Sequence, residues 1–400
     1  MTIAARTGRI REKVASRLGR SDRSAFGLWF WEIDRVLLLL VFVLISVGLI
    51  AVAAASPAAA DRYSGGNVVV APLHYFWRQL GWVALGLPVM IGVSMMPVQL
   101  ARRFALGSAA FFSVMLALVP LIGSEANGAR RWIGVGIGQF QPSEFLKPFF
   151  VVSLAWLLSL RAQDKSLPVI PLSGILTGLI AILLMKQPDF GQTIIFGCMW
   201  LALLMLAGVP IRIMGMLAGA GAVGVVLAYL FYPVATQRID NFLFSAGDTY
   251  QVDSAHATLV AGGFFGTGPG GGEMKFHLPE AHTDYIFSVI GEEFGLFACI
   301  AIAALFLAIV VRVFVKLLDE EDPFVVMAAA GLTVQFAIQA LINMAVNVNL
   351  APSKGMTLPF ISYGGSSMLA LSAGFGLLLA FTRRNPYLTR SPYVVKWSGR

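Results

Sequence analysis

Charged residues are scarce in this chain of 400 residues. Asp, Glu, Lys and Arg together make up 12% of it, whereas hydrophobic residues make up 58%. Soluble globular proteins carry about twice that share of charge. The mean hydropathy of +0.78 points the same way. The composition therefore excludes a soluble globular fold and predicts an integral membrane protein.

Cysteine is scarce too, and several motifs are missing. Cys198 and Cys299 both fall within apolar segments, which argues against a disulfide framework or a cysteine-based metal cluster. The glycines of GTGPGG, from Gly266 to Gly271, follow no predicted strand, so they do not indicate a dinucleotide site. No Walker lysine follows a glycine run, which argues against an ATP-driven pump. The sequence also has no D-x-D pair for a metal-bound sugar nucleotide.

Long apolar segments are what the sequence has instead. Ten of them approach or exceed the length of about 20 residues that a helix needs to cross a bilayer. They are residues 36–55, 80–96, 104–122, 145–160, 167–185, 190–209, 213–231, 285–311, 324–348 and 368–381. We therefore expect an all-α polytopic membrane protein with about ten transmembrane helices. Residues 1–34 would form a basic cytoplasmic tail, 35–384 the helical domain and 385–400 a second cytoplasmic tail. The first segment exceeds the apolar core of a signal peptide, so we interpret it as an uncleaved anchor.

The positions of Lys and Arg predict the orientation. With the N-terminus inside, 20 of the 29 Lys and Arg residues fall in cytoplasmic segments, as the positive-inside rule requires. Both termini are then cytoplasmic. The net charge of +8 lies mainly at the inner surface, where anionic lipids attract it, so no nucleic acid partner is needed to explain it. The outer segments are residues 123–143, 186–192, 233–284 and 349–367, and all four histidines lie on that side. The chemistry is therefore expected to face outward.

Several ionisable residues lie near the outer ends of the apolar segments. Glu144 and Lys147 are three residues apart and would share one face of a helix. The others are Asp189, Asp284, Glu292 and Glu293. A charge at such depth costs about 2.5 to 3.5 kcal/mol, so these groups are expected to face the bundle interior and to mark a functional cavity. An internal salt bridge that only holds helices together is the alternative, and it stays open above all for Glu144 and Lys147.

Four outer blocks resemble the signature blocks of the SEDS family of cell-wall polymerases. In chain order they are NGARRWIGVGIGQFQPSEFLKP (127–148), KQPDFGQT (186–193), LPEAHTDYIFSVIGEEFG (278–295) and PSKGMTLPFISYGGSS (352–367). They occur in the family's order and span most of the chain. The last block with its Lys354, and the sequence ASP at 55–57, resemble the family's cell-division branch more than its elongation branch.

The resemblance implies a ten-helix peptidoglycan glycosyltransferase in the bacterial inner membrane, at the division septum. Such an enzyme polymerises lipid II, a disaccharide-pentapeptide on undecaprenyl pyrophosphate, into β-1,4-linked glycan strands at the outer face of the membrane. The implied partners are a class B penicillin-binding protein, which supplies the transpeptidase, and other divisome proteins. A divalent cation, Mg²⁺ or Mn²⁺, at the donor pyrophosphate is a further expectation, although the sequence shows no metal-binding pattern.

Asp284 matches the family's catalytic aspartate. A β-1,4 link made from an α-linked donor inverts the anomeric carbon in one displacement, so a single carboxylate base is enough. An aspartate at the start of an apolar helix is expected to have a raised pKa through partial desolvation. Glu280 and His282, which lie beside it in the sequence, are candidates to tune or position Asp284. The alternative is that they are ordinary solvated loop residues.

Five cations are candidates to bind the pyrophosphate, whose leaving charge needs stabilisation. They are Arg130, Arg131, Lys147, Lys186 and Lys354, and the sequence does not rank them. Glu144 and Asp189 complete the predicted substrate-binding set.

Two rival functions fit part of this pattern. A transporter that flips lipid-linked sugars would share the helical bundle, the buried charges and the Gly and Pro breaks. However, the sequence shows no obvious inverted repeat, and its polar residues gather on one side of the membrane. The second rival is a non-catalytic scaffold that docks a partner synthase through the outer loops.

Overall fold

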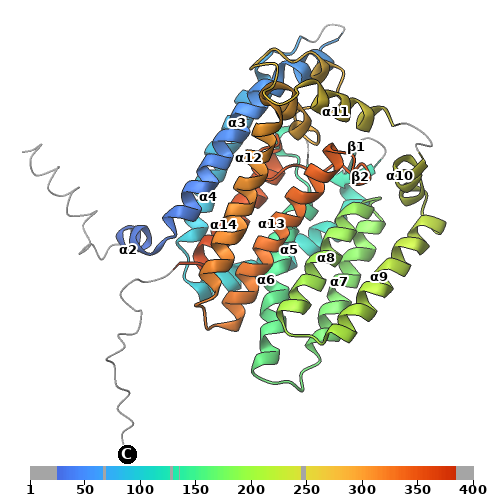
Figure 1. Cartoon of the computed structure of the whole chain (residues 1–400). Coiled ribbons are helices and arrows are strands. Elements are labelled where there is room, and N and C mark those ends of the chain that lie inside the picture. Colours follow the sequence, from blue (N-terminus) through green and yellow to red (C-terminus); the bar gives the residue numbers. More distant parts are fainter. Residues whose placement is uncertain (1–24, 66–68, 127–128, 135, 245–248, 384–400) are drawn as a thin grey trace, which may run out of the picture.

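The computed structural model describes residues 25–65, 69–126, 129–134, 136–244 and 249–383. Its main body is a bundle of apolar helices (Figure 1). The helices of the bundle are α3 (Arg35–Tyr63), α4 (His74–Ser94), α5 (Val98–Ile122), α6 (Pro142–Ser159), α7 (Val169–Met185), α8 (Phe190–Leu206), α9 (Ile211–Phe231), α12 (Ile286–Leu317), α13 (Pro323–Asn347) and α14 (Gly365–Phe381). Each predicted apolar segment coincides with one of these helices, so the expected polytopic all-α fold is confirmed. Within the described residues seven are long and apolar enough to cross a membrane, and α7, α8 and α14 are shorter.

The connections contain more regular structure than the sequence predicted. The outer segment 233–284 holds α10 (Pro233–Phe244), α11 (Tyr250–Ala261) and the 3₁₀ turn η3 (Met274–Phe276). A two-stranded antiparallel hairpin, β1 (Ser124–Ala126) and β2 (Ala129–Trp132), follows α5, and short 3₁₀ turns η1 (Gly136–Gly138) and η2 (Leu160–Ala162) flank α6. The predicted N-terminal tail contains α2 (Ala25–Glu32). Residues 1–24 and 384–400, most of the two predicted tails, lie outside the described residues.

Local sequence explains where several helices begin. Asp34 precedes α3, and its carboxylate accepts hydrogen bonds from the N–H groups of Val36 and Leu37, as an N-cap does. Asp322 caps α13 in the same way through the N–H of Phe324. Both α13 and α6 start with a proline, whose missing N–H has no partner at that position anyway.

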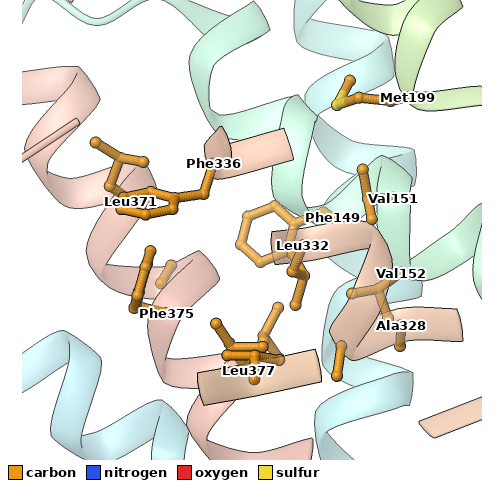
Figure 2. Close-up of a cluster of buried hydrophobic side chains, with 14 of the residues drawn as sticks. Phe149, Val151, Val152, Met199, Ala328, Leu332, Phe336, Leu371, Phe375 and Leu377 are labelled. Carbon is orange, nitrogen blue, oxygen red and sulfur yellow. The ribbon is translucent and has the colours of Figure 1, made fainter. Parts of the chain in front are cut away.

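The core lies where α14 packs against α4 and α6, and α6 packs against α13. Phe336 of α13 and Phe375 of α14 meet edge to face with ring centroids 4.8 Å apart, and Leu332 and Phe149 continue the cluster (Figure 2). In a bilayer such packing is driven by close van der Waals contact rather than by transfer from water. By contrast, α9 has no buried residue and lies at the edge of the bundle (Figure 1).

The helix that follows Asp284 is kinked. Gly295 in α12 has a φ of 79°, a left-handed conformation that glycine adopts without a steric penalty. Just before this kink the carboxylate of Glu292 accepts hydrogen bonds from the N–H groups of Met274 and Lys275. Glu293 forms a buried ion pair with Lys275. The expectation that these two glutamates mark a functional cavity was wrong. Glu292 and one oxygen of Glu293 bind η3 and fasten it to α12, whereas Oε2 of Glu293 is buried without a hydrogen-bond partner among the described residues.

The opposite end of the bundle carries an ion cluster. Arg312 of α12 donates two hydrogen bonds to Asp34, and Lys316 lies 3.2 Å from the same carboxylate. Arg383, just after α14, pairs with Glu32 of α2 at 3.3 Å. The two ends of the described chain thus meet at one end of the bundle, in agreement with termini on the same side of the membrane.

Candidate functional site in the outer cavity

A cavity of about 790 Å³ lies at the end of the bundle that is predicted to face outward. Its walls come from α4, α6, α8, α10, α11, the hairpin after α5, and the segments before α12 and α14. Charged side chains of both signs line it: Arg78, Arg131, Arg238, Glu144, Asp189, Asp253, Glu280 and Asp284. The cavity is large enough for a small-molecule headgroup, and its charges suit a polar, charged one.

Asp284 is held by its main chain. Its carbonyl oxygen accepts hydrogen bonds from the side-chain amides of Asn343 (2.8 Å) and Asn347 (3.1 Å), both on α13. Ser362 donates to the carbonyl of the preceding residue, Thr283, at 2.6 Å. No hydrogen bond to the Asp284 carboxylate is found among the described residues. The backbone is therefore clamped while the carboxylate stays available to a ligand.

A glycine, Gly355, lies opposite the carboxylate of Asp284. A Cβ added to Gly355 would lie 2.9 Å from Oδ2 of Asp284, so a larger residue would press on the carboxylate. Burial raises the pKa of Asp284 to about 7, with Glu280 and Glu144 adding to the effect and Lys354 opposing it. The raised pKa expected from the sequence is confirmed. A carboxylate with this pKa can both take and release a proton near neutral pH.

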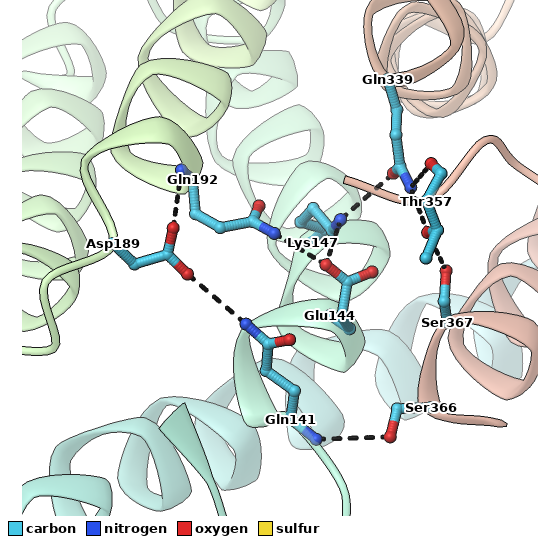
Figure 3. A network of polar contacts seen from close by, with 9 residues as sticks. All are labelled: Gln141, Glu144, Lys147, Asp189, Gln192, Gln339, Thr357, Ser366 and Ser367. Carbon is cyan, nitrogen blue, oxygen red and sulfur yellow. Dashed lines mark hydrogen bonds and ion pairs between the residues drawn. The ribbon is translucent and has the colours of Figure 1, made fainter. Parts of the chain in front are cut away.

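A polar network links three of the predicted residues (Figure 3). Lys147 is buried and donates from Nζ to Glu144 Oε1 at 2.8 Å and to Gln339 of α13 at 3.1 Å. Gln192 donates to the same Glu144 oxygen at 2.7 Å, and its N–H donates to Asp189 at 3.2 Å. The predicted grouping of Glu144, Lys147 and Asp189 is thus observed.

Within this network the three residues lie at different depths. Glu144 and Asp189 line the cavity, whereas Lys147 is 1% exposed and does not reach its surface. The alternative of a salt bridge that only holds helices together is therefore not observed for the Glu144–Lys147 pair, because both residues lie on α6 and Glu144 lines the cavity. It is an internal salt bridge, and one of its members faces the cavity.

The candidate cations separate into groups. Arg131 lines the cavity and donates to the carbonyl oxygens of Gln187 and Pro188. Its neighbour Arg130 points elsewhere: its side chain is 55% exposed and lies 3.5 Å from Glu125. Lys186 is exposed and does not line the cavity. The prediction of a binding role therefore loses its geometric support for Arg130 and Lys186 and keeps it for Arg131.

Lys354 lies behind the cavity wall. Its Nζ is buried and has no hydrogen-bond partner among the described residues, while its aliphatic stem packs on Gly191. Burial lowers the pKa of Lys354 to about 7, although Asp189 opposes this shift. Lys354 therefore does not line the cavity, and its charged form opposes the raised pKa of Asp284.

Two arginines of the cavity were missed from the sequence. Arg78 comes from α4 and Arg238 from α10, both outside the four blocks that carry the family resemblance. Burial lowers the pKa of Arg238, with Arg131 adding to the effect and Asp189 opposing it. Only the tertiary fold brings α10 beside Asp189, so no local signal could have identified Arg238.

His282 and Glu280 differ in their surroundings. His282 is buried, with its ring 4.3 Å from that of Tyr75 and 5.3 Å from that of Tyr363. Burial lowers the pKa of His282 to about 4, so the ring is neutral at pH 7. Glu280 lines the cavity beside Asp284. The alternative of an ordinary solvated residue is therefore wrong for His282.

A metal site made by the chain alone is not evident. No group of three or more His, Cys, Asp or Glu residues that could hold a metal ion occurs in the part of the chain that the structure describes. The residues of the cavity therefore do not form a complete ligand set. A divalent cation at a bound pyrophosphate stays a prediction.

Within the described residues, ten apolar helices form a bundle with a charged cavity at one end, which defines a multi-pass membrane protein with a polar site. The family model of the FtsW, RodA and SpoVE proteins, described as cell cycle proteins, matches residues 34–387. The chain belongs to this family, as its resemblance to the SEDS proteins predicted.

The similar proteins agree with this assignment. A protein of Caulobacter vibrioides named probable peptidoglycan glycosyltransferase FtsW is 41% identical over 92% of this chain and 93% of the relative. A Coxiella burnetii protein of the same name is 34% identical over 87% of this chain and 96% of the relative. The RodA crystal structure from Thermus thermophilus has the same fold, with a TM-score of 0.65 and 24% identity over 88% of this chain and 96% of that one.

A further solved structure is described as a peptidoglycan synthase complex that coordinates polymerization and crosslinking. One of its chains matches with a TM-score of 0.70 and 25% identity, covering 88% of this chain and 97% of that one.

Proposed function

We propose that this protein is a peptidoglycan glycosyltransferase that polymerises lipid II into β-1,4-linked glycan strands during septal cell-wall synthesis. The observation that carries the proposal is the carboxylate of Asp284, which lies without a hydrogen-bond partner among the described residues in a charged cavity. Relatives with the name probable peptidoglycan glycosyltransferase FtsW support the same activity. The enzyme would act at the outer face of the inner membrane.

In this reaction Asp284 takes the proton of the acceptor 4-hydroxyl. The resulting oxygen attacks the anomeric carbon of the donor, the bond from that carbon to the pyrophosphate breaks, and the configuration inverts. The lipid pyrophosphate leaves with additional negative charge, which fixed cations stabilise. Arg78, Arg131 and Arg238 line the same cavity, which supports this role for them because guanidinium groups bind phosphate oxygens in a bidentate manner.

The partner proposed for this enzyme is a class B penicillin-binding protein, together with other divisome proteins. The matched chain from a peptidoglycan synthase complex supports such a partnership. A divalent cation at the donor pyrophosphate belongs to the same proposal and would be held mainly by the pyrophosphate oxygens.

Polymerisation by purified protein tests the proposal. We expect the detergent-solubilised wild-type chain, with the class B penicillin-binding protein added, to convert lipid II into glycan strands. The Asp284→Asn variant, purified in the same way, serves as the control against a contaminating polymerase. Absence of product from a correctly folded wild-type chain and its partner would contradict the proposal.

The same assay separates the rivals. A non-catalytic scaffold would give no product beyond that of the partner alone. A flippase would move lipid II across vesicle membranes without extending it. The structure gives the flippase no support, because the charged cavity lies at one end of the bundle and the charges described at the other end are paired with one another.

A further inference from the structure

A second carboxylate lies on the same short turn as Asp284. The carbonyl oxygen of Glu280 accepts hydrogen bonds from the N–H groups of Thr283 (3.1 Å) and Tyr285 (3.3 Å), so the chain closes on itself between them. Glu280 and Asp284 both line the cavity. Glu280 has a φ of 52°, a left-handed conformation that glutamate seldom adopts. Backbone strain of this kind persists where the surroundings enforce it, often at functional sites.

The side chain of Glu280 is fixed by neutral donors. Its Oε1 accepts a hydrogen bond from the hydroxyl of Tyr63, at the end of α3, at 3.0 Å. Its Oε2 accepts one from the hydroxyl of Thr283 at 2.8 Å. No ion pair joins Glu280 to a cation among the described residues. The carboxylate is therefore held in place and its negative charge is not neutralised.

The other charged or titratable groups around the turn do not neutralise the negative charge of Glu280. The neighbouring His282 is uncharged because of its burial between aromatic rings. Tyr63 of α3 and Tyr75 of α4 face Glu280. The cations Arg62 and Arg78 act on these two tyrosines, and neither forms an ion pair with Glu280 among the described residues. Asp284 itself faces Lys354, from the segment before α14, and Glu144 of α6.

We propose that Glu280 is a positioning residue of the reaction, whose fixed negative charge keeps the neighbouring Asp284 basic enough to take the acceptor proton. The inference rests on the proposed function. Its physical basis is that a like charge nearby disfavours ionisation of a carboxyl group, which then holds a proton more tightly. In agreement, Glu280 follows burial as a cause of the raised pKa of Asp284. Tyr63 ties this arrangement to the outer end of α3.

The test is the pH profile of lipid II polymerisation. A general base must be deprotonated to act, so the wild-type rate should fall on the acid side with a midpoint near pH 7. In Glu280→Gln the midpoint should move about one pH unit lower, and the maximal rate should fall a few-fold because the base is weaker. Glu280→Asp keeps the charge and tolerates a left-handed backbone, so it should restore most of the wild-type midpoint.

Glu273→Gln is the matched control. It removes an exposed carboxylate from the same outer segment, away from the cavity, and should leave the profile unchanged. If Glu280→Gln does not fold, Glu280→Asn removes the same charge and suits the left-handed backbone better.

Two results would overturn the inference while the proposed function stands. An unchanged midpoint in a folded, active Glu280→Gln enzyme would show that the charge of Glu280 does not act on Asp284. Complete loss of turnover at every pH, with normal melting, would make Glu280 the base. Failure of the wild-type enzyme to polymerise would instead refute the proposed function.

Discussion

Two aspartates of this protein stand in the same sequence context and in opposite environments. Asp34 precedes α3 and Asp284 precedes α12, each just before a long apolar helix. Asp34 receives hydrogen bonds from two backbone N–H groups and from Arg312, with Lys316 close by. The carboxylate of Asp284 has no such partner among the described residues and faces a cavity.

The pKa values express this difference. Burial alone would raise the pKa of Asp34, but the hydrogen bonds from Arg312 and Leu37 and the charge of Lys316 outweigh it, so the pKa lies below its ordinary value. Asp34 therefore stabilises the fold at neutral pH, and this contribution is lost only in strong acid. Asp284, with its pKa raised to about 7, reduces stability once the pH exceeds its ordinary value of 3.8. A buried aspartate whose charge is left uncompensated is a candidate for catalysis.

The largest expected effect comes from Asp284→Asn, which removes the base and keeps the shape of the side chain. The polymerisation rate should fall about 10²- to 10⁴-fold, with normal partner binding. The melting temperature at neutral pH should be no lower than that of the wild type, because ionised Asp284 reduces stability there. Asp284→Glu should retain a little activity, because displacement of a reacting group by about 1 Å can cost a hundredfold. Near-normal glycan synthesis by folded Asp284→Asn would exclude the base assignment.

Lys147→Ala should reduce both stability and activity, because Lys147 pairs with Glu144, which lines the cavity. Its removal leaves Glu144 without its cation and should lower the free energy of unfolding by about 3 to 5 kcal/mol. Activity should fall as well. Thermal melting in detergent measures the first effect and lipid II polymerisation the second. An unchanged melting temperature would exclude a structural role for Lys147.

Asp34→Asn should reduce stability and spare catalysis, the reverse of Asp284→Asn. Asparagine still caps a helix, so the substitution isolates the charge. We expect a loss of about 3 kcal/mol, at the lower end for buried pairs, because the Arg312 side chain is 36% exposed. The rate per folded molecule should stay at the wild-type level. A lost rate with normal melting would mean that the inner ion cluster contributes to function.

The smallest effects on activity are expected for two adjacent arginines, Arg130 and Arg131, and should differ between them. Arg131→Ala should reduce kcat/KM for lipid II about tenfold, because it removes one cation from the cavity. Arg130→Ala should change neither activity nor melting measurably, because exposed ion pairs contribute little. Steady-state kinetics of both variants provide the comparison. An equal loss of kcat/KM in the Arg131→Ala and Arg130→Ala variants would contradict the observation that Arg131 lines the cavity and Arg130 lies at the surface.

The ten helices could be predicted from the sequence because a membrane span is a local property of about 20 consecutive residues. The position of Asp284 at a helix start and its raised pKa were predictable for a similar reason. The roles of Glu292 and Glu293 were not. Their partner Lys275 lies in a different segment, and no periodicity connects η3 with α12.

The sequence by itself determined the bundle, the family and the segment that carries the candidate base. The tertiary structure decided which charges meet. Arg130 and Arg131 are neighbours in the chain, yet one lies at the surface and the other in the cavity, where Arg78 and Arg238 join it from distant helices. The physical reason is that hydropathy acts along the chain, whereas the compensation of a buried charge depends on groups that only folding brings within a few ångströms.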